Sequence, residues 1–173
     1  MQEKRRASSG AAHTADYFHD AGDPYAHLMA QVLPDFAARY DIDLKIHLAG
    51  PPPDWAAPER ERLETYSRED ADRLAKRAGL SFRDPGKQPS AESIAAANAA
   101  LAAAIDKGSF LTDAAGIGVA LWSGTLSGAP AADVSARLSE GSARREELGH
   151  YLGATLNYAG EWYWGVDRLH YLE

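Results

Sequence analysis

Four side chains near the N-terminal end have the types and spacing of a metal or proton-transfer site. His19 and Asp20 are adjacent, and Asp23 and His27 are four residues apart, which places the last two on one face of a helix. Imidazoles and carboxylates can bind a metal or transfer protons. No third convincing ligand accompanies Asp23 and His27, so we expect no metal. Asp23 is then either the N-cap of a helix or an acid–base group.

The chain of 173 residues contains no cysteine. This absence excludes disulfides, thiolate metal sites, cysteine nucleophiles and dithiol redox chemistry within the chain. A net charge of −7 disfavours nucleic acid and anionic membranes as partners. We find no apolar run of membrane-spanning length and no apolar signal-peptide segment. We therefore expect a cytoplasmic protein.

Hydropathy patterns predict the elements that must position these side chains. The N-terminal part contains a strand, a helix capped by Asp23 and kinked at Pro34, and a second strand: Ala15–Asp20, Pro24 to about Tyr40, and Asp43–Ala49. This βαβ order predicts a parallel pair of strands. Residues 1–12 are expected to form a disordered leader, and residues 13–173 a single domain.

The middle of the chain, about residues 58–149, is rich in alanine and predicts an all-helical insertion. The expected helices are Pro58–Tyr66, Ser67–Ala78 with Ser67 and Asp70 close to a capping box, Ser90–Ile105, Ser109–Trp122 and Arg144–Leu152. The C-terminal part predicts a hairpin and the start of a helix: Ala154–Tyr158, Glu161–Trp164 and Arg168–Glu173. The order β-α-β, helical insertion, β-β-α is that of an α/β, thioredoxin-like fold.

Two segments at opposite ends of the chain carry a family resemblance. His19–Pro34 (HDAGDPYAHLMAQVLP) resembles the first turn and helix of the DsbA-like thioredoxin families. It is closest to the branch of kappa-class glutathione transferases and 2-hydroxychromene-2-carboxylate isomerases, whose turn reads approximately D-x-x-S-P-Y-S-Y-x-A. Gly160–Glu173 (GEWYWGVDRLHYLE) is similar to the G-E-x-F-W-G-x-D-R-L-x-x-L-E signature that closes the same domain. The resemblance implies the thioredoxin-like fold.

The resemblance also implies a set of site residues. Asp23 and Ala26 stand where the DsbA-like enzymes have their two cysteines, and Asp23 replaces the serine of the glutathione-using branch. Asp23 is thus the expected acid–base group, assisted by Tyr25 or His27. The residues implied for glutathione binding are Gly153, Ala154, Thr155, Val166 and Asp167. Ala154 stands where the fold normally has a cis-proline, so we expect a trans peptide bond before it.

Three functions remain open from the sequence. The first is a glutathione-dependent isomerase or transferase that acts on a small molecule, with Asp167 anchoring the ligand. The second is a catalytically degenerate thioredoxin-like scaffold or dimerisation domain, which could belong to a longer chain. The third is a metal-dependent hydrolase that uses His19, Asp23 and His27. Glutathione is the expected cofactor.

Overall fold

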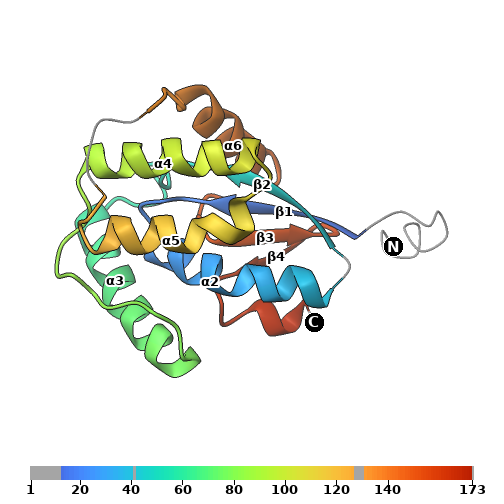
Figure 1. Ribbon diagram of the computed structural model, residues 1–173, viewed down its shortest axis with the longest axis horizontal. Coiled ribbons are helices and arrows are strands. Elements are labelled where there is room, and N and C mark those ends of the chain that lie inside the picture. The colour runs from blue at the N-terminus through green and yellow to red at the C-terminus, as the bar shows by residue number, and fades with distance from the viewer. Residues whose placement is uncertain (1–12, 41, 127–130, 173) are drawn as a thin grey trace.

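A four-stranded mixed sheet forms the centre of the molecule (Figure 1). The computed structural model describes residues 13–40, 42–126 and 131–172, so the predicted leader lies outside the described residues. The strands, in the spatial order β2-β1-β3-β4, are β1 (His13–His19), β2 (Ile42–Leu48), β3 (Thr155–Tyr158) and β4 (Glu161–Trp164). β1 pairs in parallel with β2 and antiparallel with β3, and β4 pairs antiparallel with β3. Segments from the two ends of the chain therefore share one sheet.

Five helices surround the sheet in the described part of the chain, and a short 3-10 helix ends it. They are α2 (Pro24–Arg39), α3 (Arg60–Ala78), α4 (Ala91–Asp106), α5 (Phe110–Trp122), α6 (Ser135–Glu147) and η1 (Leu169–Tyr171). Figure 1 shows α2 and α5 across one face of the sheet, whereas α3 projects beyond its edge. This element order confirms the predicted α/β, thioredoxin-like fold. No helix among the described residues has the length and apolar character needed to cross a membrane.

The start of α2 follows from local sequence. Asp23 has extended backbone angles, and its side chain accepts a hydrogen bond from the Tyr25 amide, as an N-cap residue does. Pro24 occupies the first helical position, where its missing N–H costs nothing. The predicted N-cap is confirmed. The helix continues through Pro34 to Arg39, and the kink expected at Pro34 stays a prediction.

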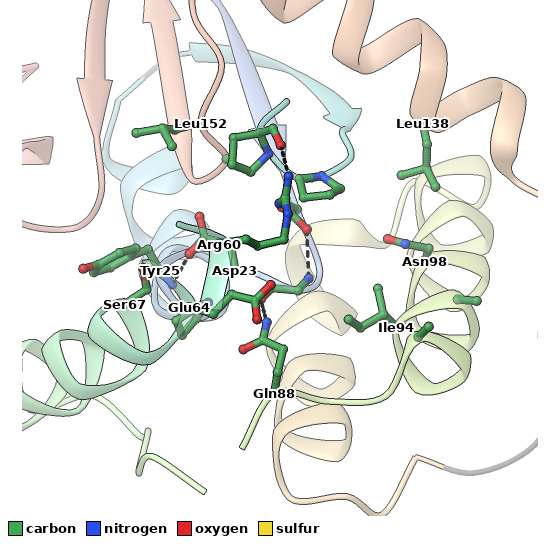
Figure 2. Close-up of a pocket in the computed structure, with 18 of the residues that line it drawn as sticks. Asp23, Tyr25, Arg60, Glu64, Ser67, Gln88, Ile94, Asn98, Leu138 and Leu152 are labelled. Atoms are coloured by element: carbon green, nitrogen blue, oxygen red, sulfur yellow. Dashed lines mark hydrogen bonds between the residues drawn. The ribbon is translucent and has the colours of Figure 1, made fainter. Parts of the chain in front are cut away.

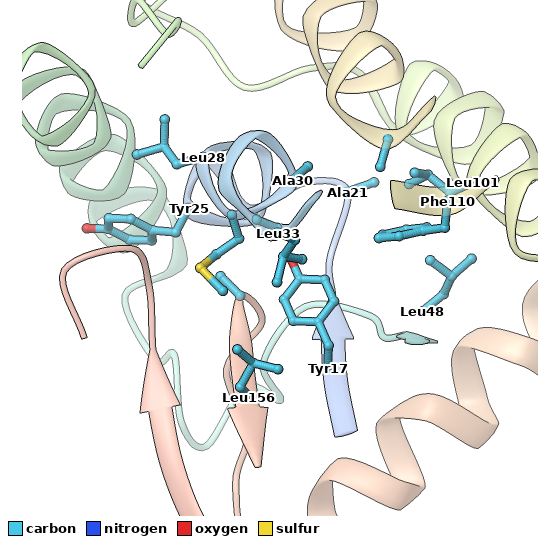
Figure 3. Close-up of a cluster of buried hydrophobic side chains, with 14 of the residues drawn as sticks. Tyr17, Ala21, Tyr25, Leu28, Ala30, Leu33, Leu48, Leu101, Phe110 and Leu156 are labelled. Carbon is cyan, nitrogen blue, oxygen red and sulfur yellow. The ribbon is translucent and has the colours of Figure 1, made fainter. Parts of the chain in front are cut away.

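The core lies between the sheet and α2 (Figure 3). Tyr17 of β1 and Leu156 of β3 point from the sheet towards Leu33 of α2, whereas Leu28 lies on the far side of that helix, and all four side chains have no exposed surface. Their burial supplies the main stabilising term of the fold, because apolar area removed from water contributes about 25 cal/mol per Å². The N-terminal end of α2, and with it Asp23, is thereby fixed to the end of β1.

The prediction of two short helices over Pro58–Tyr66 and Ser67–Ala78 is wrong, because α3 is one helix over Arg60–Ala78. Ser67 lies inside this helix and is buried rather than capping a terminus. Tertiary packing overrides the local capping pattern, since Arg68, Ala71 and Ala75 form a buried stripe at helical spacing. Gly79 ends the helix with a left-handed backbone, as expected.

Two further predicted helices have different bounds. The helix expected over Arg144–Leu152 is α6, which starts earlier at Ser135 and ends at Glu147. This helix packs against the end of β2 at Gly141 and Ser142, and Gly149 has a positive φ of 89° just after its end. The helix expected from Arg168 is the short 3-10 turn η1, while both hairpin strands are confirmed.

α6 packs closely against the end of β2 through a glycine. A Cβ on Gly141 would overlap the backbone carbonyl oxygen of Leu48. The side chain of Ser142 accepts a hydrogen bond of 3.0 Å from the Gly50 amide. Only a residue without a side chain lets the helix approach the strand this closely. This approach sets how α6 lies over the end of the sheet.

We therefore expect Gly141→Ala to destabilise the fold by about 2 kcal/mol, because the new methyl group must push α6 away from β2. Gly116→Ala is the matched control, since Gly116 is an exposed helical residue of α5 with open space around it. The control should stabilise the protein by about 0.5–1 kcal/mol. Denaturant unfolding of both variants measures the difference, and equal stability would contradict the close packing of α6.

Candidate functional site

A cavity of about 810 Å³ opens beside the N-terminal end of α2 (Figure 2). Its floor is the turn between β1 and α2, with Asp20 and Asp23, together with Gly153 from the loop before β3. α3 forms one wall with Arg60 and Glu64 among its residues. The opposite wall comes from α4 and the start of α6 and is mainly apolar, with Ile94, Ala95, Leu138 and the amide of Asn98.

The turn between β1 and α2 holds two carboxyl groups at the cavity floor. The Asp23 amide donates to the backbone oxygen of Asp20 at 3.0 Å, which closes the turn. Asp20 Oδ1 accepts a hydrogen bond of 2.9 Å from the Gly22 amide, and Asp23 Oδ1 accepts one of 2.9 Å from the Tyr25 amide. Each carboxyl group is thus oriented by its own backbone through one oxygen. The second oxygen of each group accepts no backbone hydrogen bond from the residues that the structure describes.

Both carboxyl groups hold protons more tightly than free aspartate. Burial raises the pKa of Asp20 to about 6. Burial, together with the negative charge of Asp20, raises the pKa of Asp23 to about 7. The backbone hydrogen bonds and the charge of Arg145 oppose these shifts. Near neutral pH the pair therefore supplies both a proton acceptor and a proton donor.

Arg145 is a buried positive charge behind this pair. Its side chain comes from α6 and is 2% exposed, and its Nε and Nη1 have no hydrogen-bond partner among the described residues. Burial lowers its pKa, whereas the charges of Asp20 and Asp23 raise it. An unpaired guanidinium in the interior is costly unless carboxylates balance it. Arg145 consequently favours the ionised form of at least one of the two acids.

Gly153 brings the loop before β3 against the acids. A Cβ at this position would lie 2.7 Å from Cβ of Asp20 and 3.2 Å from Oδ2 of Asp23, so any side chain would have to displace them. The peptide bond before Ala154 is trans, as expected. Ala154 is fully buried with φ of 54°, and its carbonyl accepts a hydrogen bond from the Gly165 amide at 2.9 Å. Thr155 is also buried and donates to the Leu152 carbonyl at 3.2 Å.

The expected helpers of Asp23 have different surroundings. Tyr25 lines the cavity, and its hydroxyl donates to Asp70 at 2.9 Å. Burial and this bond raise its pKa, so the phenol stays neutral. His27 instead lines a second, very small cavity with His19, and its Nε2 lies 3.1 Å from the Ser81 carbonyl. The structure therefore brings Tyr25, but not His27, to the cavity that holds Asp23.

The residues implied for glutathione binding are not gathered around one cavity. Gly153 lines the large cavity, but Ala154, Thr155, Val166 and Asp167 do not. Asp167 is half-exposed, and its carboxylate lies 3.6 Å from Nε of the neighbouring Arg168. The carboxylate that would hold the ammonium of a glutamyl group thus has a protein partner outside the cavity.

A chain of hydrogen bonds ties α3 to the turn of the two acids. Arg68, buried on α3, donates to Asp84 and Gln88 at 3.1 Å each. The Gln88 side-chain amide in turn donates to the Gly22 carbonyl at 2.6 Å, between Asp20 and Asp23 (Figure 2). The wall and the floor of the cavity are therefore mechanically connected.

Sequence reasoning missed most of the residues that complete the site. Asp20 was considered only as a metal ligand, and Arg60, Glu64, Asn98 and Arg145 were not singled out. One signal was present, since Gly141 and Arg145 are four residues apart and share the buried face of α6. An arginine on such a face is unusual enough to suggest a buried charge partner.

No group of three or more histidine, aspartate or glutamate side chains with a metal-binding arrangement occurs in the part of the chain that the structure describes. His19 and His27 lie in the small cavity, whereas Asp23 lies in the large one. The structure therefore does not bring the three residues of the hydrolase hypothesis to a common centre.

Comparison with known proteins supports the fold assignment. No protein-family model and no curated protein sequence matches the chain. Among solved structures, a 2-hydroxychromene-2-carboxylate isomerase (HCCA isomerase) has a similar fold, with a TM-score of 0.63 and 16% sequence identity over 92% of each chain. The chain thus has the DsbA-like thioredoxin fold that its two terminal segments predicted.

The raised pKa of Asp23 gives a pH-dependent stability with a defined sign. The folded protein binds this proton more tightly than the unfolded chain does. The proton therefore stabilises the fold fully below pH 3.8, and this stabilisation is lost as the pH rises through about 7. Asp23→Asn keeps an N-cap side chain and removes the titration. We expect the free energy of unfolding of the variant, relative to wild type, to rise by about 4 kcal/mol between these limits.

The comparison must be made as a difference between variant and wild type. Burial lowers the pKa of His19 to about 3, and this group contributes stability that is lost as the pH falls, which opposes the effect of Asp23. Asp113→Asn, an exposed position on α5, controls for the loss of one carboxylate. The raised pKa would be contradicted if the free energy of unfolding of Asp23→Asn, relative to wild type, fell or stayed constant as the pH rises.

Proposed function

From the fold shared with a 2-hydroxychromene-2-carboxylate isomerase, we propose that this protein is an isomerase or transferase that acts on a small molecule. It works by proton transfer at Asp23 and Asp20 and uses no thiol of its own, because the chain has no cysteine. The observation that carries the proposal is the pair of buried carboxyl groups at the floor of an open 810 Å³ cavity. We also propose the cytoplasm as its location, on the sequence arguments alone.

The two acids suit isomerisation because they can exchange one proton between two positions of a substrate. Near pH 7 an ionised carboxylate of the pair accepts a proton from an acidic C–H bond. The electron pair of that bond moves into the adjacent unsaturated group, and the protonated partner returns a proton at another atom. No proton is gained or lost overall. The backbone bonds at Gly22 and Tyr25 hold both groups in place during the exchange.

Aromatic and cationic residues around the pair have supporting roles. The Tyr25 ring packs edge-on against Trp164 at 5.5 Å between centroids, and both rings line the cavity. Together they exclude water from one side of the acids and contact the apolar parts of a ligand. Arg145 stabilises the carboxylate that forms when the pair gives up a proton. His27 receives no role in this proposal.

Glutathione fits this arrangement poorly. A glutathione thiolate placed at the N-terminal end of α2 would face two carboxyl groups rather than a hydroxyl or a thiol. The negative charge of an ionised carboxyl group repels the thiolate. The Ala154 carbonyl and the Asp167 carboxylate already have protein partners. We therefore derive no step through glutathione, which the family resemblance implied as the cofactor.

The alternative of a degenerate scaffold or homodimerisation domain predicts a cleft filled by aromatic side chains. The cavity next to Asp23 is open instead, and this supports a ligand-binding role. Exposed aromatic side chains lie on separate elements, for example Trp55 before α3 and Tyr171 in η1. A homodimer stays a prediction.

Proton transfer can be tested without knowing the natural substrate. We expect the protein to accelerate hydrogen–deuterium exchange at the carbon atoms next to the carbonyl of 2-tetralone, a neutral apolar ketone, in D₂O. Asp23→Asn should lower this acceleration by about 100-fold or more, because a positioned acid–base group contributes typically that much. Proton NMR measures the exchange rate.

Asp113→Asn should retain the wild-type exchange rate, because Asp113 is exposed on α5 and does not line the cavity. An equal rate for wild type and Asp23→Asn would contradict proton transfer at this residue. It would favour the scaffold alternative.

Glutathione binding can be tested directly by calorimetry. Because carboxyl groups occupy the expected thiol position, we predict a dissociation constant no tighter than about 1 mM, which corresponds to weak and nonspecific affinity. Asp23→Ser restores the hydroxyl of the glutathione-using branch and should tighten binding. A wild-type dissociation constant in the low micromolar range would contradict a thiol-independent mechanism.

A further inference from the structure

The large cavity has an uneven charge balance. Among the described residues that line it, the acidic ones are Asp20, Asp23, Glu64 and Asp133, and the basic one is Arg60. The guanidinium of Arg60 already has protein partners, since it donates to the Asp54 carboxylate and to the Pro52 carbonyl at 2.8 Å each. A ligand in this cavity therefore meets more acidic than basic side chains on the side of α3 and the acid turn.

Glu64 belongs to the same electrostatic group as the acid pair. Its negative charge raises the pKa of Asp20, against the opposing charges of Arg145 and Arg60. Figure 2 shows Glu64 on the same side of the cavity as Asp23, whereas Ile94, Asn98 and Leu138 lie on the opposite side. One end of the cavity is thus acidic and the other is mainly apolar.

Asn98 is an independent sign of a polar ligand group. Its side chain comes from α4, lines the cavity and is only 6% exposed. Its Oδ1 is buried without a hydrogen-bond partner among the described residues. A buried amide oxygen without a partner costs about 1–3 kcal/mol, and a bound ligand that donates a hydrogen bond removes this cost.

We infer that the cavity binds an apolar molecule with a basic nitrogen, whose ammonium or iminium group lies between Glu64 and the Asp20–Asp23 pair. The apolar body packs on Ile94 and Leu138, and a hydrogen-bonding group at its far end reaches Asn98. This inference rests on the proposed function, because it takes the cavity as the substrate site. Anionic ligands, including carboxylates and glutathione, are disfavoured by the same charges.

A cation in this position makes binding depend on pH. The charged groups that line the cavity are Asp20 and Asp23 from the turn, Arg60 and Glu64 from α3 and Asp133 before α6, and the charge of Arg145 acts on the two acids from outside the lining. The acids Asp20 and Asp23 bind protons near neutral pH, and an arriving cation favours their ionised forms. Binding of an amine therefore releases protons and becomes stronger as the pH rises from about 5.5 to 8, while the amine remains protonated.

Three probes of nearly equal shape test the inference by calorimetry: 1-naphthylmethylamine, 1-naphthalenemethanol and 1-naphthoic acid. At pH 7.5 we expect the amine to bind at least about tenfold tighter than the alcohol, and the acid at least about tenfold weaker. Titrations in buffers of different ionisation enthalpy should detect proton release with the amine only.

Two helix α3 variants provide a matched pair. Glu64→Gln should weaken amine binding by about threefold or more and leave alcohol binding unchanged. Glu69→Gln removes an exposed carboxylate of the same helix, which pairs with Arg73 at 3.2 Å, and should change neither. The contact with Asn98 at the apolar end of the cavity is tested with 5-(aminomethyl)naphthalen-1-ol, which adds a hydroxyl group to the parent amine. This compound should bind tighter than the parent amine, and Asn98→Leu should abolish the gain in affinity.

The outcomes separate this inference from the proposed function. Equal affinities for the amine and the alcohol, tightest binding of the acid, or no binding of any probe would overturn the preference for a cation. If 2-tetralone exchange still depends on Asp23 in that case, the proposed proton transfer stands while the inferred substrate class fails. If the amine is not preferred and 2-tetralone exchange does not depend on Asp23, the cavity is not a substrate site.

Discussion

The burial of two carboxyl groups in one short turn is the constraint on which the rest of the site depends. Asp20 directly follows β1 and Asp23 caps α2, so the acids adjoin the two elements that hold the core together. Their charges must be balanced within the protein, and Arg145 of α6 provides that balance from behind. The helical insertion is therefore needed for the electrostatics of the acids as well as for the walls of the cavity.

Much of the fold could be predicted because local signals and tertiary structure agree there. Alternating polarity marks β2, the Ala159-Gly160 pair marks the hairpin, and Asp23 followed by Pro24 marks the start of α2. The failures occur where packing overrides a local pattern. The hydroxyl of Ser67 suggested a helix start, but the buried stripe of α3 runs through it. The early start of α6 depends on the contact of Gly141 with β2, which no periodicity reveals.

The candidate site could be predicted only in part, for a related reason. Asp23 could be found because it has an acid–base side chain and directly precedes Pro24, which marks the start of a helix. Glu64, Asn98 and Arg145 come from three helices of the insertion, and their meeting depends on how these helices pack around the sheet. The resemblance carried glutathione-binding positions onto the loop around Ala154, but it could not indicate that the local partners of these residues differ.

The hydrogen bonds that run from Arg68 through Gln88 to the Gly22 carbonyl couple the width of the cavity to the geometry of its acids. An oversized ligand that pushes α3 outwards also pulls on the turn between Asp20 and Asp23. Such a ligand loses catalytic alignment in addition to fit. Discrimination by molecular size would then be expressed in the rate of the chemical step, so a bulky analogue that still binds would act as an inhibitor rather than as a slow substrate.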